Sequence, residues 1–245
     1  MKNKKRIRRI LLGTAALLCV LVLACGIYVG NYYHADAAAV EAFSQGYSDI
    51  TVQTDGNITA FIPDSPKAGL IFYPGGKVEH TAYTPLMQAC AKEGILCILV
   101  KMPCNLAVLD MNAAEGLAQN DPQVDTWYIG GHSLGGSMAA SFAAENTAWV
   151  EGLILLAAYS TEPLEIPVLS IRGSEDRVLN MEKYEKYRTN LPADLEEHIL
   201  EGGNHAGFGF YGPQEGDGTA TISSREQIAG TAERIGAFIA GLPIA

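Results

Sequence analysis

The pentapeptide Gly-His-Ser-Leu-Gly at residues 131–135 constrains the fold more than any other segment of this chain. It follows the apolar run 127–130 and precedes a helix-forming stretch at 134–145. The pattern G-x-S-x-G is typical of a strand that turns into a helix so sharply that only small residues fit beside the serine. We therefore expect Ser133 at the carboxyl end of a strand, with its hydroxyl exposed as a nucleophile. The alternative is an ordinary glycine-rich turn.

A membrane-crossing segment is predicted at the N-terminus. Six of the first nine residues are Lys or Arg, and residues 10–33 carry no charge, which is long enough to span a bilayer. Because basic residues stay on the cytoplasmic side, the rest of the chain is expected outside the cytoplasm, at the cell membrane. We predict a basic cytoplasmic tail (1–9), a single-pass transmembrane signal anchor (10–30), a short helical stalk (31–48) and one globular domain (49–245).

A cleavable export signal has a similar composition and is the alternative to an uncleaved anchor. The segment Leu23-Ala24-Cys25-Gly26 resembles a bacterial lipoprotein processing site, which would leave Cys25 as a lipid-bearing first residue, although Leu23 fits that pattern poorly. Both routes export the domain, and we favour the anchor. A buried core helix is a third interpretation of the same segment.

The charge of the exported part limits its partners. The chain has a net charge of -10, and all of its 27 acidic residues lie after the basic tail, against 11 of its 17 Lys and Arg. A domain this acidic does not suit nucleic acid or an anionic membrane surface. Its cysteines, Cys90, Cys97 and Cys104, lack the number and spacing of a disulfide framework or a zinc site, so we predict that they are core residues.

Short apolar runs alternate with helical patterns along the domain. Residues 50–54 and 57–62 flank Asp55-Gly56 and predict a hairpin with a tight primed turn. The later alternation is typical of an α/β fold with a mostly parallel central sheet and helices on both faces. We expect strands at 69–73, 95–101, 126–130, 152–158, 168–172 and 197–201, and helices near 80–93, 105–119, 134–146, 180–190 and 224–241.

Two loops offer polar partners for Ser133. A serine hydroxyl needs a histidine to accept its proton and a carboxylate to orient that histidine. In an open parallel sheet such groups gather beyond the carboxyl ends of the strands. The last two predicted strands are followed by Gly-Ser-Glu-Asp-Arg-Val at 173–178 and Gly-Gly-Asn-His-Ala-Gly at 202–207. These loops supply the candidates Asp176 and His205.

Other titratable residues are weaker candidates. Glu175 is the alternative acid beside Asp176. Of the remaining histidines, His34 lies beside the membrane segment and His198 falls within a predicted strand. His132 lies inside the sharp turn 131–135, the nucleophile elbow, and is expected to pack or cap. His80 follows the loop after the first central strand and either contacts substrate or begins a surface helix.

The order Ser133, Asp176, His205 and the segments GSEDRV and GGNHAGFG resemble α/β-hydrolases of the dienelactone-hydrolase-like group, over roughly residues 50–241. The resemblance implies the α/β-hydrolase fold and an esterase-like mechanism with an acyl-enzyme intermediate. It also favours Asp176 over Glu175 as the acid.

The oxyanion formed by attack on an acyl carbon needs backbone N–H donors that are already aimed at it. Leu134, directly after the nucleophile, supplies one. In this fold the second comes from the loop after the first central strand, here Pro74-Gly75-Gly76-Lys77, with Gly76 or Lys77 as the donor. Many relatives have His-Gly at this place, so Pro74 is a departure. The alternative is a purely structural Gly-Gly turn.

The substrate pocket is expected to be open. Few residues separate the predicted strands 152–158 and 168–172, where larger relatives insert a lid, so we expect no large lid domain. The glycine- and proline-rich segment 202–224 is a candidate substrate-contacting loop. The residues predicted to contact substrate are Tyr83, Met102, Tyr159 and Phe208. The alternative for the aromatic residues at 208–211 is that they anchor their loop in the core.

Together these features predict a membrane-tethered serine hydrolase outside the cytoplasm. It would cleave a carboxylic ester or thioester of a small-molecule acyl substrate and would need no metal or organic cofactor. Acyl transfer to an acceptor of the cell envelope would use the same residues. A third hypothesis is that the domain is non-catalytic and uses the hydrolase fold for binding.

Overall fold

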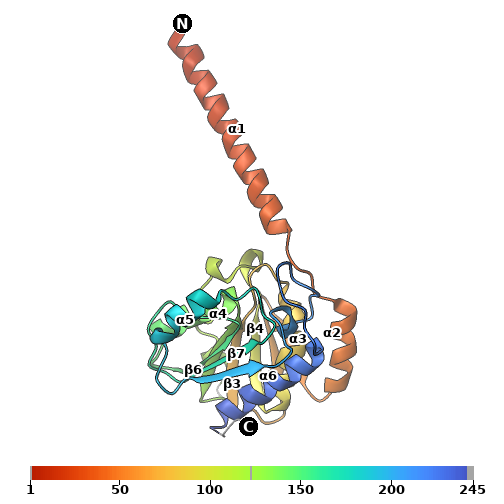
Figure 1. Cartoon of the computed structure of the whole chain (residues 1–245). Coiled ribbons are helices and arrows are strands. Elements are labelled where there is room, and N and C mark those ends of the chain that lie inside the picture. Colours follow the sequence, from red (N-terminus) through yellow and green to blue (C-terminus); the bar gives the residue numbers. More distant parts are fainter. Residues whose placement is uncertain (1, 122, 242–245) are drawn as a thin grey trace. The chain divides into compact units, whose positions relative to one another are not determined.

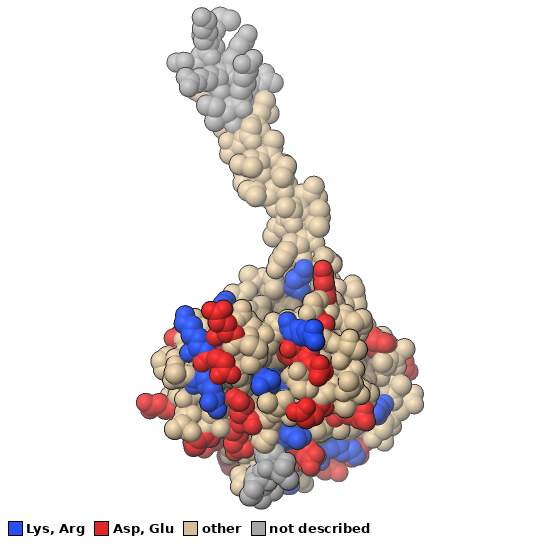
Figure 2. Space-filling model, viewed as in Figure 1, with Lys and Arg blue, Asp and Glu red and all other residues tan. Residues whose placement is uncertain are grey.

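The computed structural model describes residues 2–121 and 123–241, and the chain divides into two units, Met1–Tyr32 and Tyr33–Ala245. The first unit contains one helix, α1 (Lys2–Gly30). Its segment Leu11–Gly30 has a mean hydropathy of 2.4 and is long and apolar enough to cross a membrane, a property shared by cleavable export signals. Figure 2 shows no acidic or basic side chain along it. The basic side chains predicted for the tail lie outside the described part of the structure.

The second unit is built on a sheet whose described strands have the order β1-β2-β4-β3-β5-β6-β7-β8 (Figure 1). The pairs β1/β2 and β2/β4 are antiparallel and all the others are parallel. This is the mostly parallel sheet that the sequence predicts. The strands are β1 (Thr51–Asp55), β2 (Ile58–Ile62), β3 (Ala68–Tyr73), β4 (Ile95–Val100), β5 (Trp127–His132), β6 (Val150–Leu156), β7 (Val168–Gly173) and β8 (Glu196–Leu200).

Three of the described helices of the domain begin at side-chain caps. The side chains of Asp36 and Asn180 accept backbone hydrogen bonds at the starts of two helices, and Ser223 with Glu226 forms a capping box at the start of the last. The described α-helices of the domain are α2 (Ala37–Ser44), α3 (Thr84–Lys92), α4 (Leu134–Glu145), α5 (Met181–Tyr187) and α6 (Ser224–Ile239).

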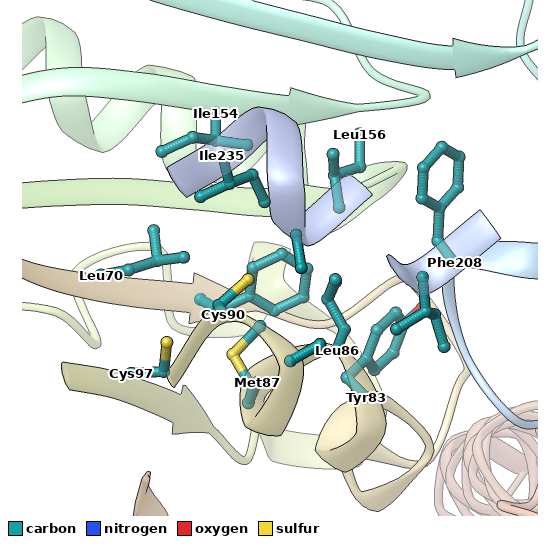
Figure 3. Packing of buried hydrophobic residues seen from close by; sticks show 14 of the residues in the cluster. Leu70, Tyr83, Leu86, Met87, Cys90, Cys97, Ile154, Leu156, Phe208 and Ile235 are labelled. Carbon is teal, nitrogen blue, oxygen red and sulfur yellow. The ribbon is translucent and has the colours of Figure 1, made fainter. Parts of the chain in front are cut away.

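Each face of the sheet carries its own hydrophobic core. Along β3, Leu70 and Phe72 point into a cluster that includes residues of α3 and α6 (Figure 3), whereas Ile71 and Tyr73 belong to a cluster with residues of α4. Successive residues of a strand point to opposite faces, so a strand buried on both faces is apolar throughout. The sheet is therefore a rigid support for the loops at its carboxyl edge.

The hairpin β1–β2 is confirmed: its two-residue loop starts at Gly56, which has φ 55°, as primed turns require. The helix predicted at 105–119 is wrong. That segment forms turns and short 3-10 helices, Ala107–Leu109 and Ala118–Asn120. Asp110, Asn112 and Gly116 are poor helix formers that favour turns, and the apolar run at 106–109 has no helical periodicity.

The segment predicted as a stalk contains the expected helix, α2, but this helix packs on the domain. Phe43 is buried in the core, and its ring contacts the rings of Tyr47 and Phe210. The backbone N–H of Asp36 donates to the carbonyl oxygen of Phe210. Residues 33–48 are thus part of the compact unit that carries the sheet.

The cysteine predictions hold for two of three residues. Cys90 and Cys97 are buried, as expected for core positions, and no described cysteine forms a disulfide. Cys104 is exposed, which contradicts the prediction. It lies in the short 3-10 turn Pro103–Asn105, in which no residue is buried, and has φ 53°.

Candidate active site

Ser133 lies in the predicted sharp turn between β5 and α4, with φ 52° and ψ -122°. A Cβ atom at Gly131 would lie 2.7 Å from the carbonyl oxygen of Tyr73, and one at Gly135 would overlap the carbonyl oxygens of Tyr73 and Pro74. Glycine at both positions is therefore required for the close approach of the turn to β3. The strained backbone sets the serine at the carboxyl edge of the sheet.

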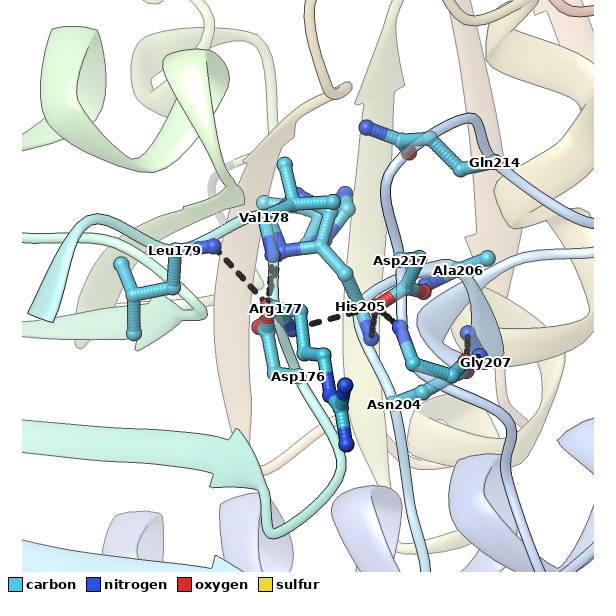
Figure 4. Close-up of polar contacts among 12 residues, drawn as sticks. Asp176, Arg177, Val178, Leu179, Asn204, His205, Ala206, Gly207, Gln214 and Asp217 are labelled. Atoms are coloured by element: carbon cyan, nitrogen blue, oxygen red, sulfur yellow. Dashed lines mark hydrogen bonds and ion pairs between the residues drawn. The ribbon is translucent and has the colours of Figure 1, made fainter.

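His205 and Asp176 meet at the same edge. His205 Nδ1 lies 2.8 Å from Asp176 Oδ2, and their side chains are only 1% and 2% exposed (Figure 4). Asp176 Oδ1 also accepts hydrogen bonds from the backbone N–H groups of Val178 and Leu179. Burial raises the pKa of the Asp176 carboxyl, but the hydrogen bond and charge of His205 and these two N–H groups outweigh it, so the pKa lies below its usual range. Asp176 is thus held ionised.

The second ring nitrogen of His205 is available for chemistry. Nδ1 is paired with Asp176, and Nε2 is buried without a hydrogen-bond partner among the described residues, so it is not bonded to Ser133 Oγ in this structure. An imidazole that donates from Nδ1 to a carboxylate keeps a lone pair on Nε2. Nε2 is therefore the atom that can accept a proton. Catalytic hydrogen bonds are often unformed in a site without substrate.

The loop after β3 holds one free N–H group beside Leu134. The N–H of Gly75 donates to the hydroxyl of Tyr83 at 3.1 Å, and that of Lys77 donates to the carbonyl oxygen of Asn105 at 2.7 Å. The N–H of Gly76 has no acceptor among the described residues, and a Cβ at this position would lie 2.8 Å from Leu134 Cδ2. Of the two predicted donors, Gly76 is the one whose N–H is unengaged.

The N–H of Leu134 is also unengaged within its helix. Leu134 is the first residue of α4, and the first N–H groups of an α-helix have no intrahelical acceptor. The positive end of the helix dipole adds to its attraction for an oxyanion. Two backbone donors thus flank the elbow.

A cavity of about 220 Å³ opens at Ser133. Its walls combine small apolar side chains with the polar groups of Ser133, Ser137 and Asn180, and its size suits a short acyl group or one end of a longer one. Its lining includes Tyr159, as predicted, together with residues after β7 that the sequence does not single out: Val178, Leu179 and Asn180. A larger cavity, about 390 Å³, lies between Glu185 and Leu195 and holds none of the candidate catalytic residues.

Three residues predicted to contact substrate are instead buried. Tyr83 and Phe208 are fully buried and belong to the core cluster with α3 and α6, while Met102 is buried in the cluster on the other face. Phe208 packs against the ring of His132, with centroids 5.4 Å apart. Aromatic side chains that anchor a loop bury most of their apolar area, so the burial of Phe208 agrees with the loop-anchoring alternative.

His132 and Tyr83 form a buried pair beside His205. His132 Nδ1 lies 2.8 Å from the Tyr83 hydroxyl, and the His132 ring lies 4.5 Å from that of His205. Burial, followed by the charge of His205, holds the pKa of His132 well below its usual value. His132 is therefore neutral at physiological pH. Its packing role agrees with the expectation for the second residue of the elbow.

Asp217 is a site residue that the sequence does not reveal. Its carboxylate accepts hydrogen bonds from the backbone N–H groups of His205 at 3.3 Å, Ala206 at 2.9 Å and Arg177 at 3.3 Å (Figure 4). Arg177 follows Asp176, so one side chain joins the acid loop to the histidine loop. The only sequence sign is an acidic residue within the glycine-rich segment 212–218, where Asp side chains often bond to turn N–H groups.

A strained serine at the carboxyl edge of a mostly parallel sheet, beside an aspartate–histidine pair, is the arrangement of α/β-hydrolases. Residues 69–229 match the alpha/beta hydrolase family, and the chain belongs to this family. Comparison of the sequence with curated proteins finds no match.

Solved structures with the same fold include three hydrolases. A bacterial membrane phospholipase A, described as a virulence factor, has 15% identity and a TM-score of 0.61, covering 96% of this chain and 98% of its own. A dienelactone hydrolase from Anabaena variabilis has 13% identity and a TM-score of 0.60, covering 80% and 100%. A predicted CIB-like hydrolase from Thermoplasma acidophilum has 16% identity and a TM-score of 0.57, covering 76% and 99%. At these identities the likeness is one of fold.

Proposed function

We propose that this protein is a membrane-tethered serine hydrolase that acts outside the cytoplasm on a carboxylic ester or thioester through an acyl-enzyme intermediate. The observation that carries the proposal is the 2.8 Å pairing of His205 Nδ1 with Asp176 Oδ2 at the sheet edge that also holds the strained Ser133. The proposed triad is Ser133, His205 and Asp176.

In this mechanism Ser133 Oγ attacks the acyl carbon while His205 Nε2 takes the hydroxyl proton. The resulting imidazolium is stabilised by the ionised Asp176, which also holds the ring in the productive tautomer. His205 then gives the proton to the leaving alcohol or thiol. Water then gives a proton to the same nitrogen and attacks the acyl carbon. The bond between that carbon and Ser133 Oγ breaks, the acid leaves, and Nε2 returns the proton to Oγ. No step needs a metal or an organic cofactor.

The oxyanion would be held by the N–H groups of Gly76 and Leu134. Both are unengaged within the described structure, and the two residues are in contact range of each other. Donors fixed in advance at the oxyanion position are worth about 10²–10³ in turnover each. The N–H of Lys77 donates to the carbonyl oxygen of Asn105, so in this proposal Lys77 helps to hold the loop in place and does not bind the oxyanion.

Two observations support the membrane tether. The apolar stretch Leu11–Gly30 follows a strongly basic start, the pattern of an anchor with its N-terminus in the cytoplasm. The match to the membrane phospholipase A covers 96% of the chain, a share that residues 33–245 alone do not reach, so it extends into the N-terminal helix. The other hydrolase matches cover 76% and 80%.

The test compares Ser133→Ala with Ser141→Ala in the full chain. Ser141 is a serine of the same helix whose Oγ bonds to the carbonyl oxygen of Ser137, and it does not line the cavity. We expect Ser133→Ala to lower hydrolysis of p-nitrophenyl acetate by about 10³-fold or more and to abolish labelling by a fluorophosphonate. Ser141→Ala should retain both. Equal rates for wild type and Ser133→Ala would contradict the proposal.

A further inference from the structure

The first residues of the compact unit, 33–35, which we call the entry segment, pair with the loop after β3. This loop, residues 74–79, holds the proposed oxyanion donor Gly76 and is called the oxyanion loop below. Tyr33, the first residue of the compact unit, forms a parallel bridge with Val78. Its N–H donates to the carbonyl oxygen of Lys77 at 2.8 Å, and its carbonyl oxygen accepts from the N–H of Glu79 at 2.9 Å. The entry point of the chain is thus fixed by two backbone hydrogen bonds to the loop that follows Gly76.

Further contacts hold this entry segment to the site-bearing edge. The hydroxyl of Tyr33 accepts a hydrogen bond from the N–H of Glu215, in the same loop as Asp217. The N–H of Ala35 donates to the Glu79 carboxylate. The entry segment is therefore bonded both to the oxyanion loop and to the segment that supports the catalytic histidine.

Chain length then limits how far the membrane can be from this edge. The apolar helix ends at Gly30, only three residues before Tyr33. Three residues span at most about 11 Å, whatever direction the helix takes. The polar layer on each side of a bilayer is roughly 5–7 Å thick. If the anchor is uncleaved, residues 77–79 are confined to the membrane surface.

Exposed apolar side chains lie on the neighbouring loop. Within the described part of the domain, the exposed large hydrophobic side chains are Val52, Val108, Leu109 and Ile199. Among these four, Val108 and Leu109 are adjacent and are the most exposed, at 56% and 57%. This pair follows Asn105, whose carbonyl oxygen accepts from the N–H of Lys77. Lys77 is therefore bonded on one side to the entry segment and on the other to the loop that carries the apolar pair.

We propose that the carboxyl edge of the sheet lies on the outer surface of the membrane, that Val108 and Leu109 enter its apolar boundary, and that the substrate is an acyl ester of a bilayer lipid. This inference rests on the proposed serine hydrolase function. The cavity of about 220 Å³ takes only the ester end of such a molecule, so the remainder stays in the bilayer. The part of the chain after the basic tail has 11 basic and 27 acidic residues, a net charge of -16, which does not attract it to lipid, so the covalent tether keeps it there.

The location can be measured without any activity. In full-length protein carrying Cys19→Ala and Cys25→Ala, Cys104 is the exposed cysteine that remains, because Cys90 and Cys97 are buried. An environment-sensitive fluorophore on Cys104, in phosphatidylcholine nanodiscs, should be quenched by lipids that carry a spin label near the headgroup.

The matched control places the fluorophore on the outer strand β1, level with the middle of β4 and away from the loops at the carboxyl edge. Val52 is exposed and pairs with Phe61, which pairs with Cys97 of β4. With Val52→Cys and Cys104→Ser in the same background, the label should remain unquenched. Equal quenching at the two positions, or none at Cys104, would overturn the placement at the membrane.

The substrate class is tested by a ratio of rates. Wild type in nanodiscs should hydrolyse a fluorogenic phosphatidylcholine in the bilayer as well as water-soluble p-nitrophenyl acetate. In the double variant Val108→Asp, Leu109→Asp the ratio of lipid to soluble hydrolysis should fall about tenfold or more, the effect of losing one buried aliphatic side chain. Val52→Asp should leave the ratio unchanged.

The outcomes separate the two proposals. If wild type cleaves the soluble ester but not the lipid, or if the ratio is unchanged in the double variant, the lipid inference fails and the serine hydrolase proposal stands. If wild type cleaves neither ester, or cleaves both without needing Ser133, the proposed function itself fails.

Discussion

The hydroxyl of Tyr83 lies 2.8 Å from Nδ1 of His132 and also accepts the N–H of Gly75 at 3.1 Å. One buried oxygen atom thus joins the elbow of the serine to the loop that holds the proposed oxyanion donor. A Cβ at Gly75 would lie 2.6 Å from this oxygen, so the loop approaches it as closely as a glycine allows. The hydroxyl sets the position of the residue before Gly76.

Tyr83→Phe should lower kcat about tenfold with a small change in KM, because the N–H of Gly75 loses its acceptor and the donor after it is less well held. Tyr184→Phe is the matched control. It also removes a buried hydroxyl, one bonded to Ser170 and Glu197, away from the elbow. Steady-state kinetics and thermal melts of both variants separate the effects, and an equal loss of kcat in the two would remove the special role of Tyr83.

Asp217→Ala should lower kcat about tenfold to a hundredfold, because the N–H groups of His205, Ala206 and Arg177 lose their shared acceptor and the acid and histidine loops are no longer joined. Asp217→Asn keeps one acceptor oxygen and should retain more activity. Glu215→Ala, an exposed acidic residue of the same loop, serves as control. The finding that Asp217→Ala and Glu215→Ala have the same kcat would exclude this positioning role.

Asp176→Asn should lower kcat about 10⁴-fold, because an amide does not hold the imidazole in the required tautomer or stabilise the imidazolium. Glu175→Gln should change kcat little, since its carboxylate contacts Ser174 and not His205. The pair therefore decides which acid acts. A larger loss for Glu175→Gln than for Asp176→Asn would reverse the assignment.

The buried His132 predicts a loss of stability in mild acid. Its pKa is lowered in the folded state by burial and by the charge of His205, so below the model-peptide value of 6.5 the unfolded chain binds a proton that the folded chain does not. The contribution of His132 to stability is complete above pH 6.5 and is lost as the pH falls toward the depressed pKa, by up to about 1.4 kcal/mol per pH unit.

His132→Asn should therefore reduce the fall in the melting temperature between pH 7 and about pH 5. His198→Asn is the control, because His198 is only partly buried and its pKa is lowered less. Thermal melts across this range give the slopes. If His132→Asn has the same slope as wild type, the histidine is not buried in its neutral form.

The strands were predictable because each is a short, nearly continuous apolar run bounded by turn residues, as in Ile95–Val100. In the segment 105–119 the short apolar run at 106–109 has no helical periodicity, and Asp110, Asn112 and Gly116 favour the turns that the structure shows. The glycine pattern and the loops after β7 and β8 indicate Ser133, Asp176 and His205. Asp217 was not predictable, because its three N–H partners lie on segments that only the fold brings together.

Because Tyr33 is paired with the oxyanion loop, the way in which the N-terminus is processed determines how far Ser133 can lie from the membrane. An uncleaved helix ending at Gly30 would leave a connection of three residues, about 11 Å at full extension. Processing at Cys25 would leave eight, or about 28 Å, on a lipid instead of a helix. The catalytic domain would be identical in both forms. The short connection would restrict Ser133 to substrates at the surface of its own membrane. The longer connection would also allow it to contact molecules of the surrounding envelope.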